Sequence, residues 1–408
     1  MPFLFLILIA LLDVYAASVL QSVPRTLPWS KWIWWASTVL VWTSIAFLMF
    51  WARKNGRTDA MQMAVGWVVT ASILVYVPKM LITLPLLFED LMRVIQWLAR
   101  AVQGSENGFP ERRRFIGQLA LALAAIPLGA IIHGVWKGRF RYRVLHKELI
   151  LPDLPKAFDG YRIVQISDLH TGSFDDRKKV SYGLDLIKSL EPDALLFTGD
   201  MVNNKASELD GWEDLYTDLS AKDLKLSVLG NHDYGDYVAW SSEEEKVNNL
   251  DDLKNRQRRM GFDLLLNEHR TIEREGSRIH IAGVENWGKP PFPQYGDLDQ
   301  ATKGIPKDDF TLLMSHDPSH FDLEVKGYDK HIALTLSGHT HGMQFGIEIP
   351  GWIKWSPVRL RYPKWAGLYE ENNKRLYVNR GFGYLAFYGR VGIWPEITQF
   401  TLRSGKNA

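Results

Sequence analysis

Four long apolar runs at the start of the chain constrain its fold more than any other feature. A helix of about 20 apolar residues is long enough to cross the hydrocarbon core of a bilayer. The runs occupy residues 3–20, 32–51, 64–88 and 115–135. Each run alone could be a buried core helix, but four in succession, separated by Lys and Arg, predict a transmembrane unit of four helices over residues 1–147. Asp13 interrupts the first run, and we expect it to face the bundle interior because a carboxylate facing lipid is costly.

The charge of the chain changes where this unit ends. The chain has 48 Lys and Arg against 46 Asp and Glu, and residues 1–150 account for 16 and 7 of these. The remainder is therefore acidic on balance, which excludes a surface built to neutralise a nucleic-acid backbone. The chain has no cysteine. This excludes disulfides and thiol nucleophiles, and it limits any metal site to oxygen and imidazole ligands.

The side of the membrane is less clearly marked. The loops on the two sides of the predicted bundle carry nearly equal numbers of Lys and Arg, so the positive-inside rule does not choose between them. Arg112-Arg113-Arg114 precedes the fourth apolar run and resembles a twin-arginine export signal. This interpretation favours a catalytic unit outside the cytoplasm, on a bacterial cytoplasmic membrane. The alternative is an ordinary basic flank of a spanning helix.

Short apolar runs alternate with polar, helix-like stretches in the second part of the chain, after a connector that contains Pro152, Pro155 and Gly160. The expected strands cover residues 162–166, 194–198, 226–229, 310–314 and 332–336, and the expected helices cover about 176–190, 207–220 and 236–260. This alternation predicts an α/β unit over residues 148–408. Each of the five strands ends in polar residues, and the carboxyl ends of strands are where such sheets carry their sites.

These strand ends carry residues suited to metal binding. They read Asp168-x-His170, Gly199-Asp200-x-x-Asn203, Gly230-Asn231-His232-Asp233, Ser315-His316 and Gly338-His339-Thr340-His341. Any one of them alone could be a polar turn or a helix cap. Together they supply carboxylate, amide and imidazole ligands, which suit divalent transition metals. One carboxylate can bridge two ions about 3.5–4 Å apart, an arrangement that activates water for displacement at phosphorus.

In this order the clusters resemble the calcineurin-like metallophosphoesterase family over roughly residues 158–403, in particular its membrane-associated bacterial branch. The segments 376–383 and 395–397 resemble that branch as well. The resemblance implies a four-layer αββα sandwich of two sheets, here preceded by a four-helix transmembrane unit. It also implies hydrolysis of phosphoric ester or pyrophosphate bonds by metal-bound hydroxide, with two divalent ions such as Mn, Fe or Zn.

The resemblance also implies a role for each site residue. The implied ligands are Asp168, His170 and His341 for one ion, Asn231, His316 and His339 for the other, and Asp200 for both. His232 would protonate the leaving oxygen, and Asp233 would orient its ring. His320 is a lesser alternative to His316. Asn203 stands where many relatives have Asp, and it is either a residue supporting the ligands or a simple turn residue.

The substrate is indicated by a stretch that follows the last motif. Its aromatic residues are Trp352, Trp355, Tyr362 and Trp365, and its basic residues are Lys354, Arg359, Arg361 and Lys364. Such a mixture suits a membrane interface or an anionic lipid head group, although the same residues could simply pack a long loop. Relatives in this branch hydrolyse the pyrophosphate of UDP-2,3-diacylglucosamine, a lipid A precursor, so the resemblance suggests a phosphorylated or nucleotide-linked lipid as substrate and the bilayer as partner.

Two alternatives to a lipid substrate stay open. The first is a hydrolase of soluble phosphodiesters or nucleotides, for which the membrane unit is only an anchor. The second is a non-catalytic membrane scaffold that keeps its metals for structure. The pair His232-Asp233 weighs against the scaffold, because a structural metal site has no use for a non-ligand acid beside it.

Overall fold

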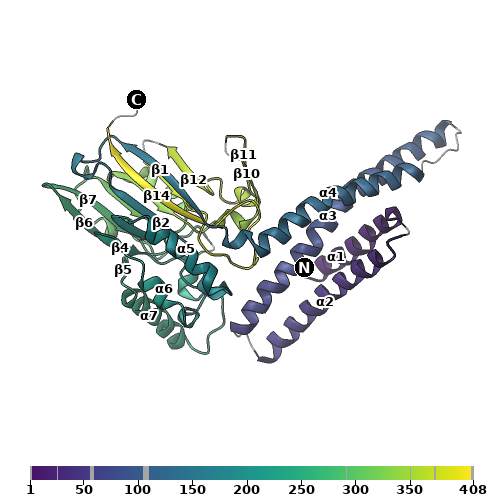
Figure 1. The fold of residues 1–408 in the computed structure, drawn as a ribbon, viewed down its shortest axis with the longest axis horizontal. Helices are drawn as coiled ribbons and strands as arrows, with labels where there is room; N and C mark the ends of the chain where they lie inside the picture. The colour runs from purple at the N-terminus through teal and green to yellow at the C-terminus, as the bar shows by residue number, and fades with distance from the viewer. Residues whose placement is uncertain are drawn as a thin grey trace. The chain divides into compact units, whose positions relative to one another are not determined.

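The computed structural model describes residues 2–24, 26–55, 59–103, 110–290, 292–349, 351–371 and 374–405. The chain divides into two compact units, Met1–Trp136 and Lys137–Ala408 (Figure 1). The predicted boundary at residue 147 falls within strand β1 (Arg143–Leu151). This strand pairs in parallel with the C-terminal strand β14 (Glu396–Ser404) along its whole length.

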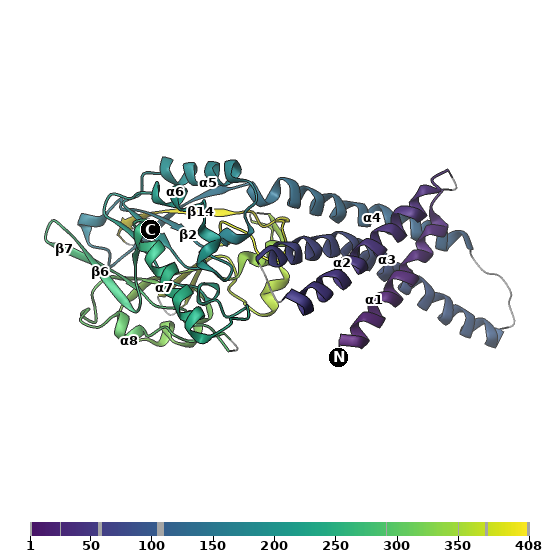
Figure 2. The same ribbon diagram turned by 90° about the horizontal axis from the view of Figure 1, so that it is seen from below.

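The first unit is helical. Its elements are α1 (Pro2–Ala16), the 3₁₀ turn Ala17–Ser22, α2 (Trp29–Asn55), α3 (Asp59–Gln103) and α4 (Pro110–Trp136). Helices α1, α2 and α4 each lie against α3 (Figures 1 and 2). In the described part of the chain, three helices are long and apolar enough to cross a membrane, namely those over Trp29–Lys54, Met61–Ala99 and Arg112–Trp136. The apolar helix Ile7–Ser22 is shorter, so the unit has three long apolar helices and one short one.

Charged residues inside this unit are paired. Asp13 is buried, as expected, and its carboxylate accepts a bond of 2.6 Å from the Lys79 ammonium. The hydroxyl of Tyr76 and the indole N–H of Trp42 also donate to Asp13, at 2.9 and 3.2 Å. A buried carboxylate among apolar helices is costly unless its oxygens are satisfied in this way. The network therefore joins α1, α2 and α3 at one depth.

A second ion-pair cluster joins α3 to α4. The Glu89 carboxylate is buried and lies 2.6 Å from Arg93 and 3.3 Å from both Arg112 and Arg113. Arg113 also pairs with Asp90. Two arginines of the basic triplet thus neutralise carboxylates of the preceding helix.

The second unit contains, among its described residues, two sheets of six strands. The first has the order β1-β14-β2-β3-β4-β5 and adds β2 (Arg162–Ile166), β3 (Ala194–Phe197), β4 (Leu224–Ser227) and β5 (Asp263–Leu264) to the pair above. The second has the order β12-β13-β9-β8-β7-β6. Its strands are β6 (Glu268–Arg274), β7 (Ser277–Gly283), β8 (Thr311–Met314), β9 (Ile332–Ser337), β12 (Gly367–Glu371) and β13 (Lys374–Val378).

The two sheets face each other and are covered by helices on their outer sides. Buried side chains from both sheets form one core between them, including Ile163, Leu196, Leu312 and Leu334. The outer face of the first sheet packs against α5 (Arg177–Ser189), α6 (Glu213–Thr217) and α7 (Glu243–Arg259). The outer face of the second packs against α8 (Leu298–Ala301) and α9 (Ser319–Leu323). The predicted four-layer αββα sandwich is therefore confirmed.

The strands that carry the polar motifs run side by side within each sheet. β2, β3 and β4 are parallel neighbours, and so are β8 and β9. Backbone pairing continues into the loops that follow, where the Asp168 N–H donates to the Gly199 carbonyl at 2.9 Å and the Gly338 N–H donates to the His316 carbonyl at 2.9 Å. The loops of the two sheets also lie against one another, because the His339 N–H donates to the Asp168 carboxylate at 3.0 Å.

Candidate metal centre

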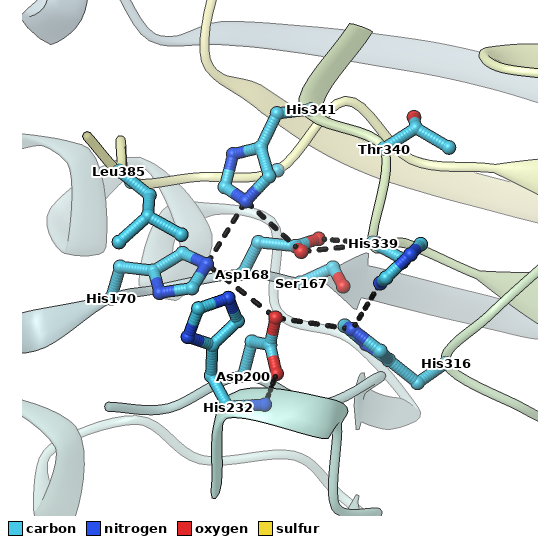
Figure 3. Close-up of polar contacts among 12 residues, drawn as sticks. Ser167, Asp168, His170, Asp200, His232, His316, His339, Thr340, His341 and Leu385 are labelled. Atoms are coloured by element: carbon cyan, nitrogen blue, oxygen red, sulfur yellow. Dashed lines mark hydrogen bonds and ion pairs between the residues drawn. The ribbon is translucent and has the colours of Figure 1, made fainter. Parts of the chain in front are cut away.

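The loops after β2, β3, β4, β8 and β9 bring together the seven residues predicted to ligate metals. Two groups of ligand atoms form, one from Asp168, His170 and His341 and one from Asp200, His316 and His339, and within each group these atoms lie within 4.8 Å of one another (Figure 3). Asn231, the seventh, directs its amide oxygen at the second group, 2.7 Å from His339 Nδ1.

Asp200 lies between the two groups. Its Oδ2 is 3.1 Å from His316 Nε2 and 3.5 Å from His170 Nε2, as the dashed lines in Figure 3 show. On the far side of His170, the Nε2 of His341 is 3.0 Å from His170 Nε2 and 3.2 Å from Asp168 Oδ1. One carboxylate oxygen thus faces both groups, which is the position that a bridging ligand requires.

Two of the imidazoles are fixed by a partner on their other nitrogen. His316 Nδ1 lies 2.7 Å from the Thr198 carbonyl, which can only accept, so Nδ1 carries the proton and Nε2 is free to ligate. His170 Nδ1 lies 3.1 Å from Asn203 Oδ1. Of the two expectations for Asn203, the structure thus agrees with the supporting role, because its amide holds the ring of a predicted ligand.

The charge states of these groups fit divalent cations. Burial opposes ionisation of Asp168 and Asp200, but the surrounding imidazoles outweigh it and hold the pKa of both carboxyls below the usual value. Burial lowers the pKa of His170 and His339, so both rings are neutral donors. Burial also opposes the charge of His316, but the Asp200 and Asp168 carboxylates raise its pKa to about 10, so metal binding there releases a proton. The donor set therefore fits two divalent ions with oxygen and imidazole ligands.

The backbone at the site is unusual. Five of the predicted ligands have positive φ angles: Asp168 (54°), His170 (48°), Asp200 (62°), His339 (70°) and His341 (50°). Few residues other than glycine adopt this conformation, although Asp and His do so more readily than most. Such backbone strain persists where the surrounding structure enforces it, and it concentrates at functional sites.

At two positions in the motifs only glycine fits, because a side chain from a neighbouring loop lies too close for a Cβ atom. A Cβ at Gly230 would collide with the Asp200 carboxylate, and a Cβ at Gly338 would collide with Ser167 Oγ and the Asp168 carboxylate. The glycine that precedes each of these ligand motifs is therefore explained by the packing of neighbouring strand ends, not by the turn alone.

His232 lies beside the two groups without joining either. Its backbone N–H donates to Asp200 Oδ1 at 2.9 Å, and its Nδ1 donates to the Asn203 carbonyl at 2.8 Å. Its ring centroid is 4.9 Å from that of His170 (Figure 3). With Nδ1 bound to a carbonyl, Nε2 is left for another partner. Burial lowers the pKa of His232, so the ring is neutral while nothing negative is bound beside it.

We expected Asp233 to orient the His232 ring, but its hydrogen bonds go elsewhere. The buried Asp233 carboxylate accepts from the backbone N–H groups of Asp200, Met201, Val202 and Gly230, at 2.8–3.3 Å. Burial and the negative charge of Asp200 raise the pKa of Asp233 to about 7. Asp233 therefore fixes the loop that carries Asp200, while the carbonyl of Asn203 holds His232.

His320, the lesser alternative to His316, is not at the site. Its Nδ1 lies 2.8 Å from Ser315 Oγ and its Nε2 lies 3.0 Å from Glu324, and its ring stacks on that of Trp287. Ser315 and Glu324 thus take up both ring nitrogens, through which a histidine binds a metal ion. His320 is therefore a core histidine with satisfied nitrogens.

Two residues at the site were not predicted to be there. The Tyr362 hydroxyl lies 2.8 Å from His339 Nε2. Arg390 is fully buried and lies 3.3 Å from His341 Nδ1. Arg390 also donates to the carbonyls of Gly383 and Arg380, at 2.9 Å each, and so folds the C-terminal loop against the site. Neither residue is spaced from the motifs in a way that marks it, because loops bring both to the site.

Comparisons with known proteins agree with this architecture. The family model described as "Probable Calcineurin-like phosphoesterase, transmembrane domain" matches residues 1–139, and the model "Calcineurin-like phosphoesterase" matches residues 161–343. The metallophosphoesterase YkuE of Bacillus subtilis is 32% identical over 304 residues, which cover 72% of this chain and 98% of that protein.

Two further relatives match over about two thirds of this chain or more. A "Transmembrane protein with metallophosphoesterase domain" of Danio rerio is 26% identical, over 70% of this chain and 62% of that protein. The "UDP-2,3-diacylglucosamine pyrophosphatase LpxG" of Chlamydia trachomatis is 28% identical, over 65% of this chain and 92% of that protein.

Proposed function

The chain belongs to the calcineurin-like metallophosphoesterase family and is a metal-dependent phosphoester hydrolase with a transmembrane domain, and we propose that its substrate is a lipid-linked phosphate or pyrophosphate. The observation that carries the catalytic part of the proposal is the position of Asp200 between two groups of ligand atoms.

In the proposed site, the first group of three residues would hold one ion and the second group with Asn231 would hold the other, with Asp200 placed to contact both. When bound, two such ions supply a water of lowered pKa and positive charge for the phosphoryl oxygens. The Asp168 carboxylate accepts a hydrogen bond of 3.0 Å from the backbone N–H of His339, which holds that carboxylate in place. The ring of His339 belongs to the second group of ligand atoms.

His232 is the proposed general acid. Because Nδ1 is bound to the Asn203 carbonyl, a proton for the leaving oxygen must sit on Nε2. Burial lowers the pKa of His232 and keeps the ring neutral. The negative charge of a bound phosphoryl group would raise that pKa, so that Nε2 becomes protonated when substrate binds. The proton then passes from Nε2 to the leaving oxygen as the bond to phosphorus breaks.

The lipid-linked substrate rests on two supports. The protein carries helices able to cross a membrane, so its catalytic unit works close to lipid. Two relatives that match this chain are named as pyrophosphatases of UDP-2,3-diacylglucosamine, a nucleotide-linked lipid. We propose this class of substrate and a bacterial cytoplasmic membrane as the location, with the catalytic unit outside the cytoplasm.

Hydrolysis by the full-length protein in detergent micelles tests the proposal. UDP-2,3-diacylglucosamine and the water-soluble chromogenic diester bis(p-nitrophenyl) phosphate are offered in parallel, with chelator and then with added manganese. We expect turnover of both that chelator abolishes and manganese restores, with the larger kcat/KM for the lipid. Turnover of the diester alone would favour a hydrolase of soluble substrates. Two bound ions with no turnover of either would favour a metal-binding scaffold.

A further inference from the structure

A two-stranded hairpin follows the proposed ligand His341, and it exposes apolar side chains while its charged side chains bond to the protein. It consists of β10 (Ile347–Ile349) and β11 (Ile353–Trp355), which pair with each other outside the two large sheets (Figure 1). Because side chains alternate along a strand and Glu348 pairs with Lys354, these two lie on one face. The other face carries Ile347, Ile349, Ile353 and Trp355.

The two charged side chains of the hairpin make polar contacts with the rest of the protein, although Lys354 is itself exposed. Glu348 accepts a hydrogen bond of 2.9 Å from Arg380. Lys354 donates to the Ala366 carbonyl, and its ammonium lies 5.3 Å from the ring centroid of Trp365. On the apolar face Ile347, Ile349 and Trp355 are 51%, 43% and 42% exposed, whereas Ile353 is half-buried. In a water-soluble sheet the pattern is reversed, with apolar side chains inward and polar ones outward.

Further exposed apolar residues extend this surface. Trp352, at the turn of the hairpin, is 76% exposed, and Leu360, just beyond β11, is 91% exposed. We call the exposed set the hairpin patch: Met343, Ile347, Ile349, Trp352, Trp355 and Leu360. Monomeric soluble proteins seldom expose so many large apolar side chains together, and such patches mark interaction sites.

The charges beside the hairpin patch are mainly positive. Arg359 and Arg361 flank Leu360 and are exposed. Among the residues that the structure describes, neither forms an ion pair with a carboxylate, and the Arg361 guanidinium lies over the rings of Phe292 and Tyr362. The carboxylate nearest in sequence, Glu348, is already paired with Arg380. The patch therefore presents apolar and aromatic groups with an adjoining positive charge.

The hairpin patch is fixed to the metal centre. The Ser356 hydroxyl donates to the Gly342 carbonyl at 2.7 Å, and the Thr340 hydroxyl donates to the Trp365 carbonyl at 2.7 Å. The same segment then supplies Tyr362, whose hydroxyl lies 2.8 Å from His339 Nε2. A molecule that binds the hairpin patch therefore lies next to the loop that carries the proposed metal ligands His339 and His341.

We propose that the hairpin patch inserts into the interface of a bilayer that contains anionic phospholipids and so presents lipid head groups to the metal centre. Exposed Trp, Ile and Leu with unpaired Arg match the apolar and anionic layers of such an interface. The spanning helices of the same chain confine the catalytic unit to a membrane surface. The inference deepens the proposed function and rests on it for the identity of the reaction, but contact with lipid is tested separately.

Site-specific fluorescence tests the contact. Because the chain has no cysteine, Trp352→Cys in the full-length protein can be labelled at one position with an environment-sensitive dye. Val247→Cys, on α7 and 49% exposed, is the matched control. In nanodiscs of phosphatidylcholine and phosphatidylglycerol, we expect doxyl-labelled lipids to quench the dye at position 352 and to leave the dye at 247 unchanged. Equal quenching at both positions, or none at 352, would overturn the proposal.

The consequence for catalysis is tested with two chromogenic diesters that share a leaving group. Trp352→Ser combined with Leu360→Ser should leave hydrolysis of bis(p-nitrophenyl) phosphate unchanged. Its KM for hexadecyl p-nitrophenyl phosphate in phosphatidylglycerol vesicles should rise roughly tenfold, because less apolar surface enters the interface. An unchanged KM for the lipid-like diester contradicts the inference. Failure of the unmodified protein on both diesters would instead count against the proposed function, while the quenching result still decides the contact.

Discussion

Around Asp200, a hydrogen bond to one nitrogen of each of three histidine rings leaves the other nitrogen for a metal ion or for substrate. The Thr198 carbonyl fixes a proton of His316 on Nδ1. Asn203 contacts two further rings, one through its side chain and one through its backbone. Its side-chain oxygen meets His170 Nδ1, while its backbone carbonyl meets His232 Nδ1. One residue therefore supports both a proposed ligand and the proposed acid, which explains why a polar residue is needed there.

The first prediction separates acid catalysis from metal binding. His232→Ala should retain both metal ions and lose about 10²–10⁴-fold in kcat, the usual contribution of a general acid. Asp200→Ala should lose both metal and activity, because its carboxylate faces both groups. Metal content by mass spectrometry and turnover of the chromogenic diester are measured together. His146→Ala, at an exposed histidine of β1, is the control, and full activity in His232→Ala would exclude the role assigned to it.

A second prediction concerns Asn203. Asn203→Ala removes the acceptor for His170 Nδ1, and we expect metal affinity to fall about 10–100-fold, with activity rescued by excess manganese. Asn203→Asp keeps an acceptor at that position and should retain most of the affinity. Metal titration followed by activity at saturating metal distinguishes the two variants. Loss of activity in Asn203→Ala that excess metal does not rescue would contradict a role confined to holding His170, because the backbone carbonyl that binds His232 is retained in this variant.

At the scale of elements, the helices of the membrane unit are joined by charges as well as by apolar packing. The Asp13 and Lys79 pair connects α1 to α3, and the Glu89 cluster connects α3 to α4. Arg112 and Arg113, which in sequence resemble an export signal, have a structural use here as counter-ions. The side on which the catalytic unit lies stays a prediction.

A third prediction follows for this unit. Lys79→Met leaves the Asp13 carboxylate buried without its cation, and we expect destabilisation of about 3–5 kcal/mol. Combining Lys79→Met with Asp13→Leu should restore much of the loss, because no unpaired charge is then buried. Thermal unfolding of the full-length protein in one detergent compares the variants. A double variant less stable than Lys79→Met alone would show that the pair does more than neutralise charge.

At the scale of the whole molecule, metal binding acts on one of the two units. The candidate ligands all lie within Lys137–Ala408, on loops that follow strands of both sheets. Ions that bind only the folded unit stabilise it by about 2.7 kcal/mol when their concentration is 100 times Kd. Bound metal would therefore also join loops of the two sheets, since Asp168 and His170 follow the first sheet and His341 follows the second.

The fourth prediction is a selective effect of metal removal. Chelator should lower the unfolding temperature of the catalytic unit by several degrees and leave the transition of the membrane unit in place. Scanning calorimetry of the full-length protein with chelator, and again after manganese is restored, measures both. Asp200→Ala serves as the control, since chelator should not shift its transition. Equal shifts of both transitions would contradict an effect confined to one unit.

Local patterns in the sequence predicted an α/β unit with metal-binding residue types at its strand ends, whereas the four-layer sandwich and the assignment of ligands came from the resemblance to the calcineurin-like metallophosphoesterase family. A long apolar run predicts a spanning helix, and a change from β-branched residues to Asp, His and Gly predicts the end of a strand. Parallel strands bring their carboxyl ends to one edge, so Asp168, Asp200 and Asn231 are brought together by topology. These features depend on neighbouring residues and on general rules of strand packing.

Tertiary structure alone decided the features that depend on contacts between distant segments. β1 is a strand because β14 pairs with it from the other end of the chain. Asp233 turns to the backbone around Asp200 because that loop offers three N–H groups, with a fourth from Gly230. Arg390 reaches His341 because a loop folds back on the site. The outward apolar face of the hairpin depends on Arg380 taking up Glu348. No local periodicity encodes such choices, because each is settled by which partner, far away in sequence, satisfies a buried charge or hydrogen bond.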